Sequence, residues 1–304
     1  MPREPAFDHD TSQIRTCWCR ASHTAPEIAS PRSLWQARRA FLQLGGALAA
    51  SAALPAIAQV EVGEGSRLRH LVPAQELEQA AEQQYTQLLQ QANAKGVLLP
   101  AQHPQTQRLQ AIAKRLIPFS SKWNARAAQW KWSVALIRSD DINAFCMPGG
   151  KIAFFTGIID KLQLSDDEVA TVMGHEMAHA LREHSRDQLA KNSATSIGIS
   201  LGAQLLGLGD VGNYAARLGG QLLSLRFSRN DETDADLVGL EIAARAGYNP
   251  QAAVSLWEKM GRATGSQSNS LSFLSTHPSG PERIRELQRN VPRVEGLYQQ
   301  ARRG

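Results

Sequence analysis

Two histidines separated by three residues stand out as candidates for metal chemistry. The segment His175-Glu176-Met177-Ala178-His179 has the pattern HExxH. On a helix these two imidazoles are about 40° apart around the axis and one turn apart along it, so both can bind one Zn²⁺. The intervening carboxylate lies next to the metal, where it can take a proton from water. The motif predicts a zinc-dependent hydrolase with two histidine ligands and Glu176 as general base.

A catalytic zinc site needs a third protein ligand as well as an open coordination position. The metzincin pattern requires Gly three residues and His six residues after His179, but Arg182 and Ser185 occupy these places. That alternative is excluded. On a continuous helix His184 would lie about 140° from His179, so we expect it to be a structural or surface histidine. The third ligand is therefore expected on a later helix.

An acidic segment about fifty residues downstream offers this ligand. Glu232 and Asp236 are four residues apart in "SRNDETDADLVG", a spacing that puts both on one helix face. Glu232 can ligate the metal, while Asp236 can accept the other ring N–H of a ligand histidine and fix its tautomer. The helix dipole favours acidic residues in a first turn, which accounts for Asp231 and can account for Asp234. We expect one Zn²⁺ per chain.

Local sequence signals predict the elements that carry these residues. Ser165 to Glu168 is a capping box that begins the HExxH helix, and apolar residues around the histidine pair indicate a buried helix. Residues 131–137 alternate like a half-buried strand, and 143–157 contain two short strands around a Pro-Gly-Gly turn. The order of strands followed by helices predicts an α+β fold, mostly helical, with a small β-sheet beside the HExxH helix. Further helices are expected at 73–94, 104–116, 190–207, 212–224, 229–246, 250–262 and 280–289.

The first 58 residues are predicted to be an export signal of the twin-arginine type. Arg38-Arg39 precedes an apolar run over 44–54 and an A-x-A cleavage signal that ends at Ala58. The apolar run is shorter than the ~20 residues of a membrane span, although an ordinary secretory signal remains an alternative. We expect cleavage after Ala58 and a periplasmic protein. Residues 59–304 are then one metallopeptidase domain, with N-terminal helices over 59–125 and a catalytic core over 126–290.

The composition limits the kinds of partner that the chain is expected to bind. The net charge of +5 in 304 residues is spread over a mixed surface, which does not suggest nucleic acid. The most apolar stretch after the signal, 194–209, is expected to be a buried helix with at most peripheral membrane contact. Cys146 lies in a strand-like run and is expected to be a buried thiol, because no partner base is identifiable.

Four sequence blocks in order resemble the gluzincin metallopeptidase family that includes HtpX, the CAAX prenyl protease, BepA and LoiP. They are "NAFCMPGGKIAFFTGII", HExxH, S-R-x-x-E-x-x-A-D over 228–236, and "STHPSGPERI" over 275–284. The resemblance is strongest to the soluble periplasmic branch and implies a zincin-like fold, with Glu232 as the third ligand. It also implies that His277 can cap the zinc; the alternative is a histidine held in a loop hydrogen-bond network. Arg229 and Arg283 are expected to form internal salt bridges.

The predicted reaction is hydrolysis of peptide bonds by a zinc-dependent endopeptidase. The resemblance implies that the substrates are unfolded or misassembled envelope and outer-membrane proteins. We expect the strand near 150–155 to pair with an extended substrate backbone. A zinc-stabilised holdase or chaperone with latent proteolysis is the alternative, and a hydrolase of peptidoglycan peptides is a third interpretation. The oligomeric state is left open by the sequence.

Overall fold

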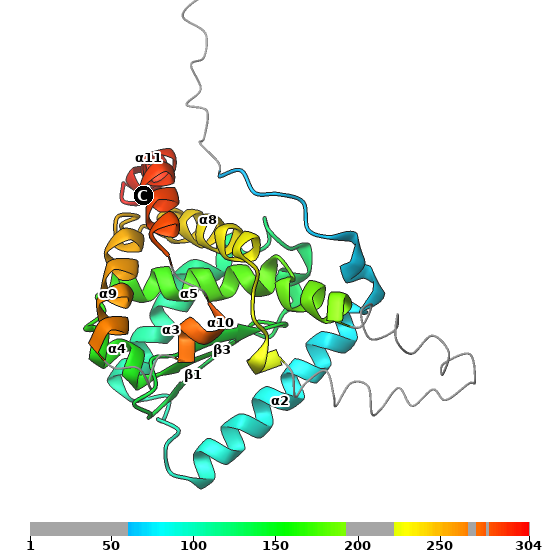
Figure 1. The fold of residues 1–304 in the computed structure, drawn as a ribbon. Helices are drawn as coiled ribbons and strands as arrows, with labels where there is room; N and C mark the ends of the chain where they lie inside the picture. The colour runs from blue at the N-terminus through cyan, green and yellow to red at the C-terminus, as the bar shows by residue number, and fades with distance from the viewer. Residues whose placement is uncertain (1–59, 193–221, 267–271, 278–279, 304) are drawn as a thin grey trace, which may run out of the picture. The chain divides into compact units, whose positions relative to one another are not determined.

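In the computed structural model the HExxH segment lies on α5 (Asp166–Leu181), which runs through the centre of the fold (Figure 1). Every residue of this helix from Glu168 onward is buried. The predicted capping box is present. The Ser165 hydroxyl accepts from the Glu168 amide at 3.3 Å, and the Glu168 carboxylate accepts from the Ser165 amide at 2.9 Å. A helix that is apolar on all sides belongs in the interior of a domain. Its histidines are therefore held away from bulk water.

The structure describes residues 60–192, 222–266, 272–277 and 280–303. The predicted export signal lies outside these residues, as do most of the predicted helices 190–207 and 212–224. Within them, α2 and α3 match the predicted bounds closely. The helical elements with defined bounds besides α5 are η1 (Arg67–Leu71), α2 (Ala74–Ala94), α3 (Pro104–Leu116), η2 (Ile117–Phe119), η3 (Ala125–Gln129), α4 (Thr156–Leu162), η4 (Leu222–Ser224), α8 (Arg229–Arg245), α9 (Ala252–Ser266), α10 (Ser272–Thr276) and α11 (Pro281–Ala301). Residues 184–192 are also helical.

The sheet has three strands: β1 (Ser133–Ile137), β2 (Ala144–Met147) and β3 (Lys151–Phe155). Their order is β1-β3-β2, with β1 parallel and β2 antiparallel to β3. Gly149 and Gly150 have φ of +82° and +76°, so the turn between β2 and β3 uses the left-handed conformations that glycine tolerates. The mostly helical chain with this small sheet confirms the predicted α+β class.

The strand order corrects the prediction about substrate pairing. We expected the strand near 150–155 to accept an extended substrate, but β3 is the central strand and has a neighbour on each side. Its backbone groups are already bonded within the sheet. β2 is an edge strand, and it also packs against α5. The sequence alone does not give strand order, because that depends on long-range packing.

The sheet separates two buried clusters. Ile152 and Phe154 of β3 belong to the main cluster together with α5, whereas Ala153 belongs to the second cluster with Leu77 and Tyr85 of α2. This alternation follows from the two-residue period of a strand. The sheet thus lies between α5 and α2.

The crossing of α5 and α8 is unusually close because both helices place a glycine there. A Cβ on Gly239 would lie 2.7 Å from the backbone nitrogen of His175 and 2.8 Å from the carbonyl carbon of Gly174. These distances are shorter than real Cβ contacts, so neither position accommodates a larger residue without a shift. The close crossing brings the acidic face of α8 within reach of the histidines on α5.

The last helix is longer than the sequence predicts. We expected it over 280–289, but α11 continues through Pro292 to Ala301. Buried Val291, Val294 and Leu297 lie at helical spacing beyond the predicted end. Their burial offsets the backbone hydrogen bond that a proline inside a helix removes. No helix in the described part of the chain is long and apolar enough to cross a membrane.

Candidate metal centre

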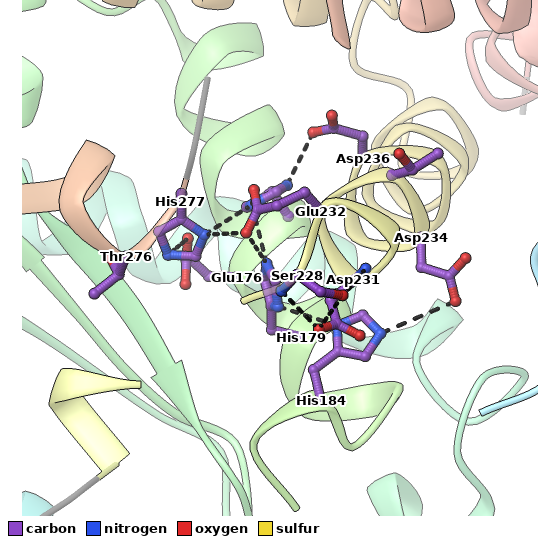
Figure 2. Close-up of polar contacts among 12 residues, drawn as sticks. Glu176, His179, His184, Ser228, Asp231, Glu232, Asp234, Asp236, Thr276 and His277 are labelled. Carbon is purple, nitrogen blue, oxygen red and sulfur yellow. Dashed lines mark hydrogen bonds and ion pairs between the residues drawn. The ribbon is translucent and has the colours of Figure 1, made fainter. Parts of the chain in front are cut away.

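Four buried side chains bring potential ligand atoms within 4.8 Å of one another: His175, His179, Glu232 and His277. The Nε2 atoms of His175 and His179 are 3.1 Å apart, and Oε1 of Glu232 lies 3.5 Å from Nε2 of His179. Nδ1 of His277 lies 3.4 Å from Nε2 of His175 and 3.0 Å from Oε1 of Glu232. Figure 2 shows Glu232 between His277 and His179. Three separate segments, α5, α8 and the end of α10, therefore meet at one point.

These separations fit a tetrahedral zinc ion. Zn–N and Zn–O bonds of 2.0–2.2 Å place neighbouring ligand atoms of a tetrahedron about 3.3 Å apart. Four of the six separations between the donor atoms, 3.0 to 3.5 Å, bracket this value, while the remaining pairs lie farther apart, within 4.8 Å. Three nitrogen donors and one carboxylate oxygen are also a donor set that zinc accepts. Burial lowers the pKa of His179 well below its usual value, and the neighbouring His175 and His277 lower it further, which favours the neutral imidazole that a metal requires.

Asp236 lies behind His175, opposite the cluster. Its Oδ1 is 3.0 Å from Nδ1 of His175. This is the contact expected for an acidic residue that fixes the tautomer of a ligand histidine. Burial opposes the charge of Asp236, but Arg283 and His175 outweigh it and lower the pKa to about 2. Asp236 is therefore a carboxylate at neutral pH.

Arg283 of α11 joins the two acidic residues of α8. Its guanidinium donates to both oxygens of Asp236 at 2.7 Å and lies 2.5 Å from Oε2 of Glu232. Its other face stacks over Trp257 at 3.6 Å from the ring centroid. The prediction that Arg283 forms internal salt bridges is confirmed. Arg229, the first residue of α8, is exposed.

Glu176 lies beside the four donors and not among them. Its Oε1 is 3.6 Å from Nε2 of His277. Burial raises the pKa of Glu176, with the partly opposing influence of His277 and His175. A carboxylate whose pKa is raised toward neutrality is suited to exchange protons. Cys146 is buried nearby, and burial followed by the charge of Glu176 raises the pKa of its thiol, in agreement with an unreactive cysteine.

His277 is held from the end of α10. Its backbone amide donates to Phe273 at 2.9 Å, and the two rings stack with centroids 4.4 Å apart. Burial opposes protonation of His277, but Glu176 and Glu232 outweigh it and raise the pKa. The alternative of a histidine bonded only to its loop does not describe this position, because its imidazole reaches the donor cluster.

His184 is a structural histidine, one of the two predicted alternatives, and it is buried rather than at the surface. It is only 5 % exposed, and its Nδ1 lies 3.0 Å from Nδ1 of His179. The prediction extended a continuous helix past His179, but α5 ends at Leu181 and Glu183 adopts a left-handed conformation with φ of 60°. This turn brings His184 back toward the ligand. Burial lowers the pKa of His184 to about 4. A positive φ at a glutamate is not readable from sequence, so this contact was missed.

The remaining acidic residues of the segment have separate roles. Asp231 caps α8: its amide donates to the Ser228 hydroxyl at 3.2 Å, and its carboxylate accepts from the Ser228 amide at 2.9 Å. Asp234 pairs with Arg182 at 3.0 Å. The helix-start interpretation of Asp231 is therefore consistent with the structure, although this residue is buried and not solvated.

A cleft of about 170 Å³ opens beside Glu176, His179 and His277. One wall is the edge strand β2. Apolar side chains supply much of the remaining lining, including Leu88, Phe145, Phe155, Leu223, Leu225 and Phe227. The described residues thus combine a polar cluster with a largely apolar cleft beside the edge strand β2.

Comparison with known proteins gives a consistent result. Residues 103–291, more than half of the chain, match the model of peptidase family M48. The mitochondrial metalloendopeptidase OMA1 of Schizosaccharomyces pombe is 37 % identical over 199 residues, which cover 65 % of this chain and 56 % of that protein. The metalloprotease LoiP of Escherichia coli is 27 % identical over 205 residues, covering 66 % of this chain and 76 % of LoiP.

A third relative is the beta-barrel assembly-enhancing protease of Escherichia coli, 26 % identical over 205 residues, which cover 64 % of this chain and 41 % of that protein. The matched region spans between about a third and three fifths of the OMA1 proteins of fission yeast, Arabidopsis thaliana and Saccharomyces cerevisiae.

Proposed function

Since this chain belongs to peptidase family M48, we propose that it is a zinc-dependent endopeptidase in which His175, His179 and Glu232 hold the metal and Glu176 is the general base. The observation that carries the proposal is the donor cluster itself. Its atoms have the spacing of zinc ligands, and a buried carboxylate with a raised pKa lies at its side. A holdase would need no such carboxylate.

A zinc ion bound there would supply a Lewis acid for the scissile carbonyl. The residues of the chain then have distinct tasks. Glu176 takes a proton from the attacking water and passes it to the leaving amine, for which its raised pKa is suited. Asp236 keeps the proton of His175 on Nδ1, so that Nε2 of this ring points to the donor cluster. The buried surroundings exclude other water and strengthen these charge interactions.

His277 makes the resting site a closed one. A catalytic zinc site keeps one position open, whereas four protein donors are typical of a closed site. His277 lies where the fourth ligand would be, at 3.0 Å from Glu232 and 3.4 Å from His175. We propose that His277 caps the zinc and must move before water can enter. Cleavage of an unfolded substrate distinguishes such a latent protease from a holdase.

The substrate is proposed to be an extended segment of an unfolded or misassembled envelope protein, including outer-membrane proteins. The edge strand β2 lines the cleft and can pair with an extended backbone, whatever its sequence. The apolar lining suits the side chains that unfolded proteins expose. One relative is named the beta-barrel assembly-enhancing protease. A periplasmic location after cleavage at Ala58 completes the proposal.

The decisive experiment combines metal analysis with cleavage of casein as a permanently unfolded substrate. The wild type is expected to contain about one zinc per chain and to cleave casein. Glu176→Gln is expected to keep zinc and fold but cleave at least ~100-fold more slowly, the scale of a lost general base. Glu258→Gln, an exposed glutamate on α9, is the matched control. Unchanged cleavage by Glu176→Gln would reject the mechanism, and a wild type without zinc would reject the function.

A further inference from the structure

The buried contact between His179 and His184 is not used by the proposed mechanism. The two Nδ1 atoms are 3.0 Å apart, and the rings meet edge to face at 76° with centroids separated by 5.0 Å. His184 is not one of the four donors of the metal cluster. In Figure 2 it lies next to His179, with its far side toward Asp234. Its imidazole therefore contacts a proposed ligand and not the metal position.

The protons of this pair can be assigned from geometry. Nε2 of His179 faces His175 and Glu232, so its lone pair must be free for a metal. A neutral imidazole then carries its proton on Nδ1, and among the described residues the acceptor in contact with this atom is Nδ1 of His184 at 3.0 Å. His184 must accept there, which puts its own proton on Nε2. That atom lies 4.0 Å from Asp234, beyond hydrogen-bond distance.

We infer that His184 is a positioning residue that accepts the Nδ1 proton of His179 and thereby fixes the tautomer and orientation of this zinc ligand. The inference rests on the proposed function, because it requires His179 to bind metal through Nε2. The two ligand histidines then have different partners: His175 has the carboxylate of Asp236, whereas His179 has a neutral imidazole. Such partners of ligand histidines orient the ring and tune its basicity.

The surrounding structure holds both rings in place. The left-handed Glu183 lies in the turn that separates α5 from the helical segment beginning at His184, and its carboxylate is bonded to Arg186 at 2.9 and 3.0 Å. On the other side, the ring of Phe227 lies 3.9 Å from the ring of His179. His179 is thus packed on its face and bonded at Nδ1, which leaves Nε2 directed at the donor cluster.

Two substitutions separate hydrogen bonding from packing. His184→Asn keeps an acceptor, because its side-chain oxygen is as many bonds from the backbone as Nδ1 is. His184→Leu has a similar bulk and no acceptor. Zinc affinity is measured by competition with a chromophoric chelator, and the Tm of each metal-free variant is recorded in EDTA. His70→Leu, an exposed histidine in η1, is the control.

We expect His184→Leu to bind zinc about 10–100-fold more weakly, the range known for lost partners of ligand histidines. His184→Asn should stay within about threefold of the wild type, and its Co²⁺ absorption spectrum should be unchanged. Wild-type zinc affinity in His184→Leu overturns the inference. Equal losses of affinity in both variants also overturn it, because they indicate packing alone.

If His184→Leu does not fold, His184→Gln replaces it, because its acceptor is displaced from the Nδ1 position while the polarity is kept. Weaker zinc binding in His184→Gln than in His184→Asn supports the inference, and equal binding overturns it. Failure of the proposed function has a different signature, namely no zinc in the wild type and in His70→Leu.

Discussion

Arg283 contacts Glu232 at the carboxylate oxygen Oε2, whereas His277 contacts the same side chain at Oε1. The guanidinium lies 2.5 Å from Oε2, while Oε1 of the same side chain lies 3.0 Å from Nδ1 of His277 and faces the donor cluster. Arg283 also neutralises Asp236, so a single cation from α11 compensates two buried carboxylates of α8.

The first prediction concerns this cation. Arg283→Met should destabilise the metal-free protein by about 3–5 kcal/mol, because it leaves buried carboxylates without their partner. Saturating zinc should restore part of this stability by supplying positive charge. Urea unfolding in EDTA and in excess zinc measures both values. Arg285→Met, at an exposed position of the same helix, should change the stability in neither condition. An equal loss of stability in EDTA and in excess zinc would show that Arg283 acts by packing on Trp257.

His277→Ala distinguishes a cap from a catalytic group. If His277 occupies the fourth position of the metal, its removal should raise basal cleavage of casein and leave bound zinc nearly unchanged, because three protein ligands suffice. If it stabilises the developing oxyanion instead, cleavage should fall by roughly tenfold or more. Zinc content and casein cleavage are measured on the same preparation. Reduced cleavage with normal zinc rejects the cap.

Gly239→Ala tests the close helix crossing. The added Cβ would meet the backbone of His175 at 2.7 Å, so α5 and α8 must separate. We expect a loss of about 1–3 kcal/mol in stability, typical of overpacking, together with weaker zinc binding. Gly261→Ala on α9 is the control, since nothing lies within 4 Å of its Cβ. It should be neutral or slightly stabilising. Normal zinc affinity in Gly239→Ala would show that the crossing does not set the site.

Lys259→Met tests an ion pair at the start of α5. Burial opposes the charge of Glu168, but hydrogen bonds from Lys259, the Ser165 amide and Ser255 outweigh it and lower the pKa. A lowered pKa stabilises the fold fully above the usual value of about 4.3, and this contribution disappears as the pH falls through the lowered pKa.

Lys259→Met should therefore lose about 1–2 kcal/mol at pH 7, a value reduced by the partial exposure of the lysine. The difference from wild type should shrink below about pH 4. Urea unfolding of the metal-free proteins at several pH values measures this difference in stability. Lys161→Met, at an exposed position, is the control. A difference that does not change with pH would mean that the charge of Glu168 is not involved.

The spacing of residues within short segments of the sequence was sufficient to predict much of the fold. The capping box at Ser165 and the glycine-rich turn after β2 were predicted correctly, because caps and turns depend on a few adjacent residues. The HExxH pattern and the four-residue spacing of Glu232 and Asp236 likewise follow from the period of a helix. The sequence therefore indicated which faces of two helices carry the candidate ligands.

The tertiary structure decided which other residues contact these faces of α5 and α8. His277 reaches the donors only because α10 returns to α5, and His184 reaches His179 only because Glu183 turns the chain. Strand order, which makes β2 an edge strand and β3 the central strand of the described sheet, likewise depends on contacts far apart in the sequence. Helical and strand periods act over a few residues, whereas these three relationships depend on chain reversals and on packing between segments, which no local pattern encodes.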